Sequence, residues 1–115
     1  MAPQKRVKAV EALSALAHEG RLSIFRLLVR TGLGGMAAGD IARKLDMLPN
    51  TLSANLAVLS GAGLVSSRRD GRSVIYSADY ERMTALLSFL MEDCCNGDAG
   101  ICAPLAAIAQ RAACC

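Results

Sequence analysis

Five cysteines carry the clearest chemistry in this sequence, and all of them lie after residue 93. They occur as two adjacent pairs and one single residue, namely Cys94 with Cys95, Cys114 with Cys115, and Cys102. In a reducing compartment we expect such an odd set to be free thiols rather than a disulfide framework. Thiolates that have no nitrogen or oxygen partner favour a soft, thiophilic ion.

Cys94, Cys95 and Cys102 are the candidate ligands. Adjacent residues on a helix point about 100° apart, so Cys94 and Cys95 can converge on one ion only where the helix ends. A predicted turn at residues 96–100 supplies that end and can fold Cys102 back beside the pair. Structural zinc fits less well, because it prefers a fourth ligand and CxxC-type spacing. The sequence therefore predicts a three-sulfur site.

A second set of residues, between positions 48 and 76, fits contact with DNA. Leu52, Leu56 and Leu59 recur on one stripe of a predicted helix. The other side of this helix is small, polar and uncharged, so it can approach base edges closely. The candidate contacts on it and on its flanks are Asn50, Thr51, Ser53, Ala54 and Asn55.

A predicted hairpin follows this helix, with its turn at Asp70 and Gly71. It gathers Arg68, Arg69 and Arg72 around its tip, where they can meet phosphate. Taken alone, a neutral helix or an Arg-rich hairpin is more often only a solvated surface. Their order, behind an upstream helix-turn-helix, favours a winged helix-turn-helix whose helix enters the major groove.

The remaining elements must position these two sites. Helices are predicted over residues 5–17, 21–30 and 38–45, the first with Val7, Val10 and Leu13 along one side. The second is apolar over more than one face and should lie at the centre of the fold. After hairpin strands over 64–69 and 72–76, a fifth helix runs from a cap at 77–79 to about residue 93, and a short last helix from 104 to 113. The predicted fold class is mainly α with a β-hairpin wing.

Length and composition agree with one small domain. The 115 residues suffice for one modest core. We divide the chain into a DNA-binding and dimerisation domain over 1–93 and a cysteine-containing, inducer-binding extension over 94–115. The net charge of +3 permits nucleic acid without demanding it. No apolar run reaches the roughly 18 residues of a membrane span, and the basic start lacks a following apolar segment. We expect a cytoplasmic protein without an organic cofactor.

Three segments, taken in order, resemble the ArsR/SmtB family of metal-responsive winged-helix repressors. Residues 13–28, LSALAHEGRLSIFRLL, resemble the family's LADPTRLxILxLL signature. Residues 52–65, LSANLAVLSGAGLV, resemble its VSxHLxxLxxAGLV reading-helix signature, and residues 68–76, RRDGRSVIY, resemble its xRxGRxxxY wing. The similarity spans about residues 8–92. Asn55 stands where the family usually has His, so base preference is expected to differ.

The resemblance implies a homodimer, built largely from the first and fifth helices, that binds an inverted repeat in double-stranded operator DNA. The fifth helix is richly apolar, with Met83, Leu86, Leu87, Leu90 and Met91. These side chains either form the dimer interface or simply complete the core of the monomer. The implied mechanism is derepression, in which ion binding near the fifth helix shifts the reading helices out of register on DNA.

The resemblance also bears on the inducer. A Cys-x-Cys site known at the family's third helix is absent here, since residues 35–40 hold no cysteine. A His/Asp/Glu zinc site on the fifth helix is also absent, because the only histidine is His18, which we expect at a helix end. Some arsenic-responsive members carry a Cys-Cys pair and a third Cys after the fifth helix. Cys94, Cys95 and Cys102 match that pattern, which implies As(III), or similarly Sb(III), as inducer.

Three alternatives stay open at this stage. Vicinal cysteines can instead form a disulfide, which would make the protein a redox- or persulfide-responsive repressor. Cys114 and Cys115 are expected to be dispensable, but they could recruit a methylated arsenical, or complete a site with Cys102. Another thiophilic metal is also an alternative inducer. An enzyme such as an arsenate reductase is disfavoured, because no cysteine sits in an anion-binding loop and no general acid or base lies near the thiols.

Overall fold

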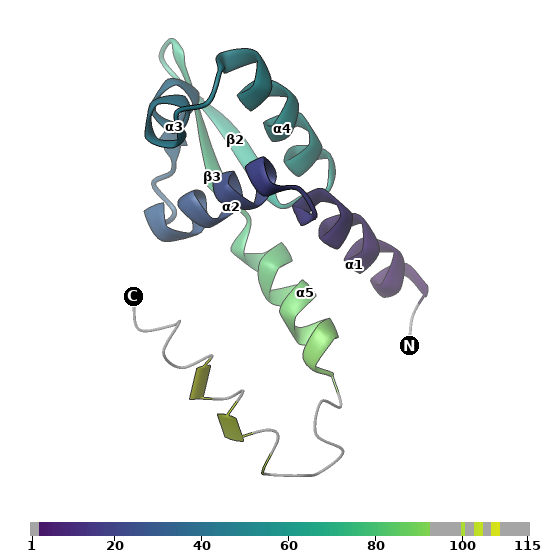
Figure 1. Cartoon of the computed structure of the whole chain (residues 1–115). Helices are drawn as coiled ribbons and strands as arrows, with labels where there is room; N and C mark the ends of the chain where they lie inside the picture. Colours follow the sequence, from purple (N-terminus) through teal and green to yellow (C-terminus); the bar gives the residue numbers. More distant parts are fainter. Residues whose placement is uncertain (1–2, 93–99, 101–102, 105–106, 109–115) are drawn as a thin grey trace.

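In a computed structural model, residues 3–92 fold into five helices and a small antiparallel sheet (Figure 1). The structure describes residues 3–92, 100, 103–104 and 107–108. The helices are α1 (Pro3–Leu16), α2 (Glu19–Thr31), α3 (Ala38–Leu45), α4 (Pro49–Gly61) and α5 (Tyr80–Met91). The strands are β1 (Met36–Ala37), β2 (Val65–Asp70) and β3 (Ser73–Ala78). This arrangement confirms the predicted winged helix-turn-helix.

The wing is a three-stranded sheet in the order β1-β3-β2, not the two-stranded hairpin that the sequence predicted. The predicted hairpin is present, with Asp70 opposite Ser73 across the turn. The extra strand β1 places Met36 opposite Tyr76 on the other side of β3. It was missed because two residues carry no alternating pattern. Gly35 makes the approach possible: it has φ +73°, and a Cβ there would lie 2.6 Å from the Tyr76 carbonyl oxygen.

The core lies where α2, α3 and α4 meet the sheet. As predicted, α2 is central, and Ile24 and Leu28 are fully buried. Ile41 of α3 packs beside them, and the leucine stripe of α4 also faces inward, with Leu52, Leu56 and Leu59 buried. Burial of each such side chain stabilises the fold by roughly 1.5–3 kcal/mol. At the base of the hairpin, Leu64 and Val65 are buried, and Val74 and Tyr76 are half-buried, so the wing packs on the body of the protein.

Side-chain capping explains where α2 and α5 begin. α2 starts at Glu19, two residues earlier than predicted, because the Nδ1 atom of His18 accepts hydrogen bonds from the backbone N–H groups of Gly20 (3.1 Å) and Arg21 (3.4 Å). His18 is therefore a helix-end residue, as expected. Asp79 caps α5 by accepting the Arg82 backbone N–H at 2.9 Å. Of the predicted last helix over 104–113, residues 104, 107 and 108 are helical, and the remainder lies outside the described residues.

α1 and α5 each leave an apolar stripe outside the core. α1 turns its small residues Ala9, Ala12 and Ala15 inward, so the predicted side with Val7, Val10 and Leu13 is 43–60% exposed. On α5, Leu86 is buried, whereas Leu87 and Leu90 are about half exposed. The two helices project together from the end of the molecule opposite the hairpin tip (Figure 1). None of the helices among the described residues is long and apolar enough to cross a membrane.

Candidate nucleic-acid interface

The outer face of α4 is small, neutral and open. Asn50, Thr51, Ser53 and Ala54 are all exposed, on the side of the helix away from the buried leucines. Pro49 occupies the first helical turn, and no acidic residue lies there. The partial positive charge of the helix N-terminus is therefore uncompensated on its own element, which favours the approach of phosphate.

Asn55 departs from its expected place. It was predicted to flank the DNA-reading face, but its side chain is only 6% exposed and points into the body of the protein. Its Nδ2 atom lies 4.0 Å from the Met47 sulfur, and it also abuts Gly20, where an added Cβ would come within 3.1 Å of Nδ2. Asn55 thus packs α4 onto the turn between α3 and α4 and onto the start of α2. Asn55 lies three residues after Leu52 and four before Leu59, at the edge of the leucine stripe, and the missing side chain of Gly20 leaves the space that it fills.

The three arginines of the hairpin do not behave alike. Successive strand residues point to opposite faces, so Arg68 and Arg69 diverge. Arg68 donates from Nη2 to the Gly34 carbonyl at 2.9 Å, which ties the hairpin to the loop before β1. Arg69 and Arg72 are exposed, and within the described part of the chain their side chains make no hydrogen bond or ion pair. These two arginines are therefore available to bind phosphate.

α3 completes the same end of the molecule (Figure 1). Its last turn carries Arg43 and Lys44, which are both exposed. Arg43 is already paired with Asp40 one turn earlier. An exposed ion pair of this kind contributes little to stability, so Arg43 remains available to exchange its partner for a phosphate.

The predicted thiol site, Cys94, Cys95 and Cys102, lies outside the described residues, as do Cys114 and Cys115. Among the residues that are described, no three His, Cys, Asp or Glu side chains gather in a way that could hold a metal ion.

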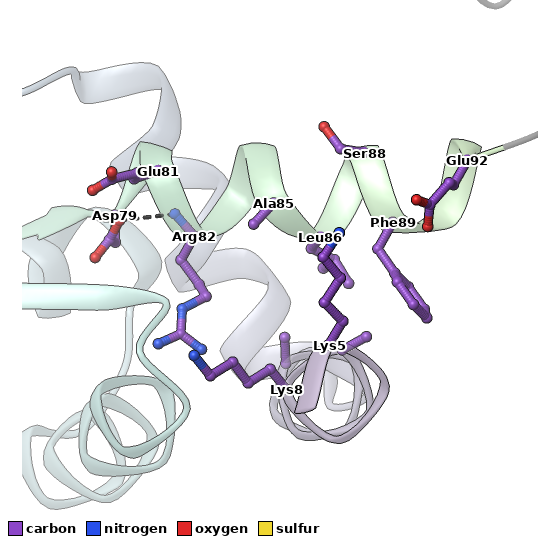
Figure 2. Close-up of a pocket in the computed structure, with 12 residues that line it drawn as sticks. Lys5, Lys8, Asp79, Glu81, Arg82, Ala85, Leu86, Ser88, Phe89 and Glu92 are labelled. Atoms are coloured by element: carbon purple, nitrogen blue, oxygen red, sulfur yellow. Dashed lines mark hydrogen bonds between the residues drawn. The ribbon is translucent and has the colours of Figure 1, made fainter. Parts of the chain in front are cut away.

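A cavity of about 430 Å³ between α1 and α5 was not predicted from the sequence (Figure 2). Its lining combines apolar residues of both helices with Lys5, Lys8 and Arg82. The signal that could have revealed it is weak: two lysines three residues apart on a helix whose inward residues are all alanine. Small inward side chains leave room that larger ones would fill.

Comparison with known proteins agrees with this geometry. A family model described as a helix-turn-helix domain matches residues 16–68. The transcriptional activator HlyU of Vibrio cholerae is 31% identical over 91 residues, covering 79% of this chain and 82% of HlyU. Its solved structure has a TM-score of 0.63 and 32% identity over 77% of this chain and 97% of that one.

Two further solved structures are similar. The homodimeric winged helix-turn-helix domain of Mb0332 from Mycobacterium bovis, described as a possible ArsR-family transcriptional regulator, has a TM-score of 0.62 and 30% identity, over 81% of this chain and 89% of that one. A possible transcriptional regulator for arsenical resistance has a TM-score of 0.62 and 28% identity, over 70% of this chain and 80% of that one. This chain belongs to the ArsR/SmtB family of winged-helix, DNA-binding transcriptional regulators.

Proposed function

We propose that this protein is a dimeric repressor that binds an inverted repeat in operator DNA and releases it when Cys94, Cys95 and Cys102 bind As(III). The proposal of DNA binding rests on one observation. The neutral face of α4 and the wing arginines that are unpaired among the described residues, Arg69 and Arg72, are both exposed at the same end of the molecule. Ser53 and its neighbours would read base edges, while Arg69 and Arg72 would hold the phosphates on either side.

The proposed dimer forms through the exposed stripes of α1 and α5. Val7, Val10 and Leu13 on one helix and Leu87 and Leu90 on the other are too exposed to serve the monomer core. Clusters of exposed apolar side chains favour an interaction surface. The homodimeric state of the Mb0332 domain supports a twofold arrangement here.

The proposed inducer site rests on chemistry rather than on observed geometry. Three thiols in the segment after α5 supply a soft, all-sulfur ligand set, which suits As(III), and Sb(III) in the same way. The similarity to a possible regulator for arsenical resistance supports this choice of ion. Because thiols must ionise to ligate, binding should release protons.

Operator release under four stimuli in parallel tests the proposal. The reduced protein, bound to a fluorescent operator, is titrated with As(III), Cd(II), Zn(II) or peroxide while anisotropy is followed. We expect As(III) to release DNA at the lowest concentration. Release by peroxide alone, reversed by a thiol reductant, would instead establish the redox alternative. That alternative has one specific support: a similar structure, at 29% identity, is described as reduced HlyU.

The sign of regulation is a separate question, because HlyU is named as an activator. A reporter gene placed behind the operator separates the two cases. Repression predicts low expression that rises with As(III). Expression that falls on deletion of the protein would show that this chain activates its target.

A further inference from the structure

The cavity between α1 and α5 is large enough for a small molecule. Its volume of about 430 Å³ lies in the range of small-ligand pockets, roughly 300–1,000 Å³. The apolar part of its lining comes from both helices and includes Ala9, Ala12, Leu86 and Phe89. An apolar body of a ligand would therefore exchange water for hydrocarbon contacts along both helices.

Three cationic side chains line the gap between the helices. Lys5 and Lys8 come from α1 and Arg82 from α5, and in Figure 2 the side chains of Lys8 and Arg82 point toward one another. Within the described residues, none of these three cations has an ion-pair partner. Two like charges converging on one space without a counterion are stabilised when an anion enters it.

The acidic residues of the lining do not fill this role. Asp79 is engaged as the cap of α5, accepting the Arg82 backbone N–H. Glu81 extends away from Lys8, and Glu92 lies at the far end of α5, beyond Phe89 (Figure 2). The lining thus has a cationic part, where Lys8 and Arg82 point toward one another, and a second part along α5, where Leu86 and Phe89 supply apolar surface and Lys5 extends toward Leu86 (Figure 2).

The cavity adjoins one edge of each apolar stripe, because Leu13 follows Ala9, and Leu90 follows Leu86, by four residues, a rotation of roughly 40°. Other stripe residues lie on the far side from the cavity. On α1, Val10 follows Lys8 by two residues, which is a rotation of roughly 200°. On α5, Leu87 precedes Phe89 by two residues, with the same rotation. A dimer formed through the stripes would therefore adjoin the apolar part of the cavity and leave Lys8 on the side away from the interface.

Arg82 connects the cavity to the DNA-reading helix. Its guanidinium packs on Gly63, just after α4: a Cβ at Gly63 would lie 2.9 Å from the Arg82 Cζ atom. The backbone N–H of Asp79 also donates to the Leu64 carbonyl at 2.8 Å. The first turn of α5 is thus attached to the turn that ends α4, so a ligand that moves Arg82 acts directly on that turn.

We infer that this cavity binds a small amphipathic anion, a carboxylate with an apolar tail, and that its binding is transmitted through Arg82 to the end of α4. The carboxylate lies between Lys8 and Arg82, and the tail packs on Leu86 and Phe89. This site contains no cysteine and requires none, so it is independent of the inducer proposed above.

Calorimetric titration of the full-length protein with octanoate, and with octanol as the uncharged match, tests the site. Octanoate should bind at least about tenfold more tightly, since octanol cannot accept the charge-assisted hydrogen bonds of a carboxylate. Lys8→Ala should weaken octanoate binding by a similar factor, and Ala85→Leu should weaken it by filling the cavity. Both positions are exposed, so neither change threatens the core. The matched controls Arg6→Ala and Thr84→Leu alter exposed positions that do not line the cavity, and should bind as the unaltered protein does.

The proposed site would be wrong if octanoate and octanol bound with equal affinity. It would also be wrong if the control variants bound octanoate as weakly as the cavity variants do. Hydrogen exchange tests the coupling without any need for DNA. Saturating octanoate should slow amide exchange at residues 61–65 as well as in α1 and α5. Protection confined to α1 and α5 would overturn the transmission to the reading helix.

Discussion

Replacing Leu87 or Leu90 by Ala should weaken the proposed dimer. Full burial of a leucine contributes roughly 1.5–3 kcal/mol, and about half of each side chain is exposed in the monomer, 50% and 51% respectively. About 1 kcal/mol per copy therefore remains for the dimer interface. A twofold interface contains each residue twice, so one substitution costs about 2 kcal/mol. The dimer dissociation constant should rise about 30-fold.

Sedimentation equilibrium over a range of protein concentrations measures this constant. Leu33→Ala is the matched control, because Leu33 is even more exposed, at 78%, but lies in the loop between α2 and β1. Its removal should leave the dissociation constant unchanged. The opposite outcome, a lower melting temperature for Leu87→Ala with an unchanged dissociation constant, would show that α5 serves the monomer core and would refute the reasoning.

Three further predictions concern DNA and inducer. Replacing Arg69 and Arg72 by Ala should flatten the slope of log affinity against log salt by about 0.9 for each phosphate that is no longer neutralised; an unchanged slope in filter binding would remove the wing from the interface. Ser53→Ala should reduce the binding free energy by about 1–3 kcal/mol on the operator and by less on random DNA. Asn55→Ala should instead lower the melting temperature of the protein and weaken its binding to operator and random DNA equally. Cys94→Ser should give a folded, DNA-binding protein that As(III) no longer releases, while deletion of Cys114 and Cys115 should change release little; the reverse pattern would place the inducer site at the C-terminus.

Periodicity and turn chemistry were enough to predict most of the fold. Leu52, Leu56 and Leu59 recur with the helical period and are buried, and the hairpin turn needs φ > 0 at Gly71, which has φ +62°. These signals are local, so a single sequence carries them. The short strand β1 depends instead on the fit of Gly35 against Tyr76, which is far away in the sequence, and no local pattern encodes that contact.

The DNA-facing residues could be predicted only in part, for the same reason. Ser53 and Asn55 are both small polar residues on one helix, and their types do not distinguish them. What separates them is Gly20 at the start of α2, where a missing side chain leaves a space that Asn55 fills. Arg68 likewise looks equivalent to Arg69 in the sequence until the Gly34 carbonyl is found beside it. Both distinctions arise from tertiary contacts.

α5 is the element on which the proposed activities converge. Its exposed stripe includes Leu87 and Leu90, the adjoining surface lines the cavity with Leu86 and Phe89, and its first turn is bonded to the end of α4 through Asp79 and Leu64. The proposed thiol ligands begin soon after its last residue, Met91, at Cys94. An ion that reorganises this segment therefore acts on a helix that would touch both the partner protomer and the DNA-reading helix. A change of about 2 kcal/mol in the dimer interface would shift the dimer equilibrium about 30-fold, which lies within the usual range of allosteric coupling. No separate relay is needed between inducer and operator.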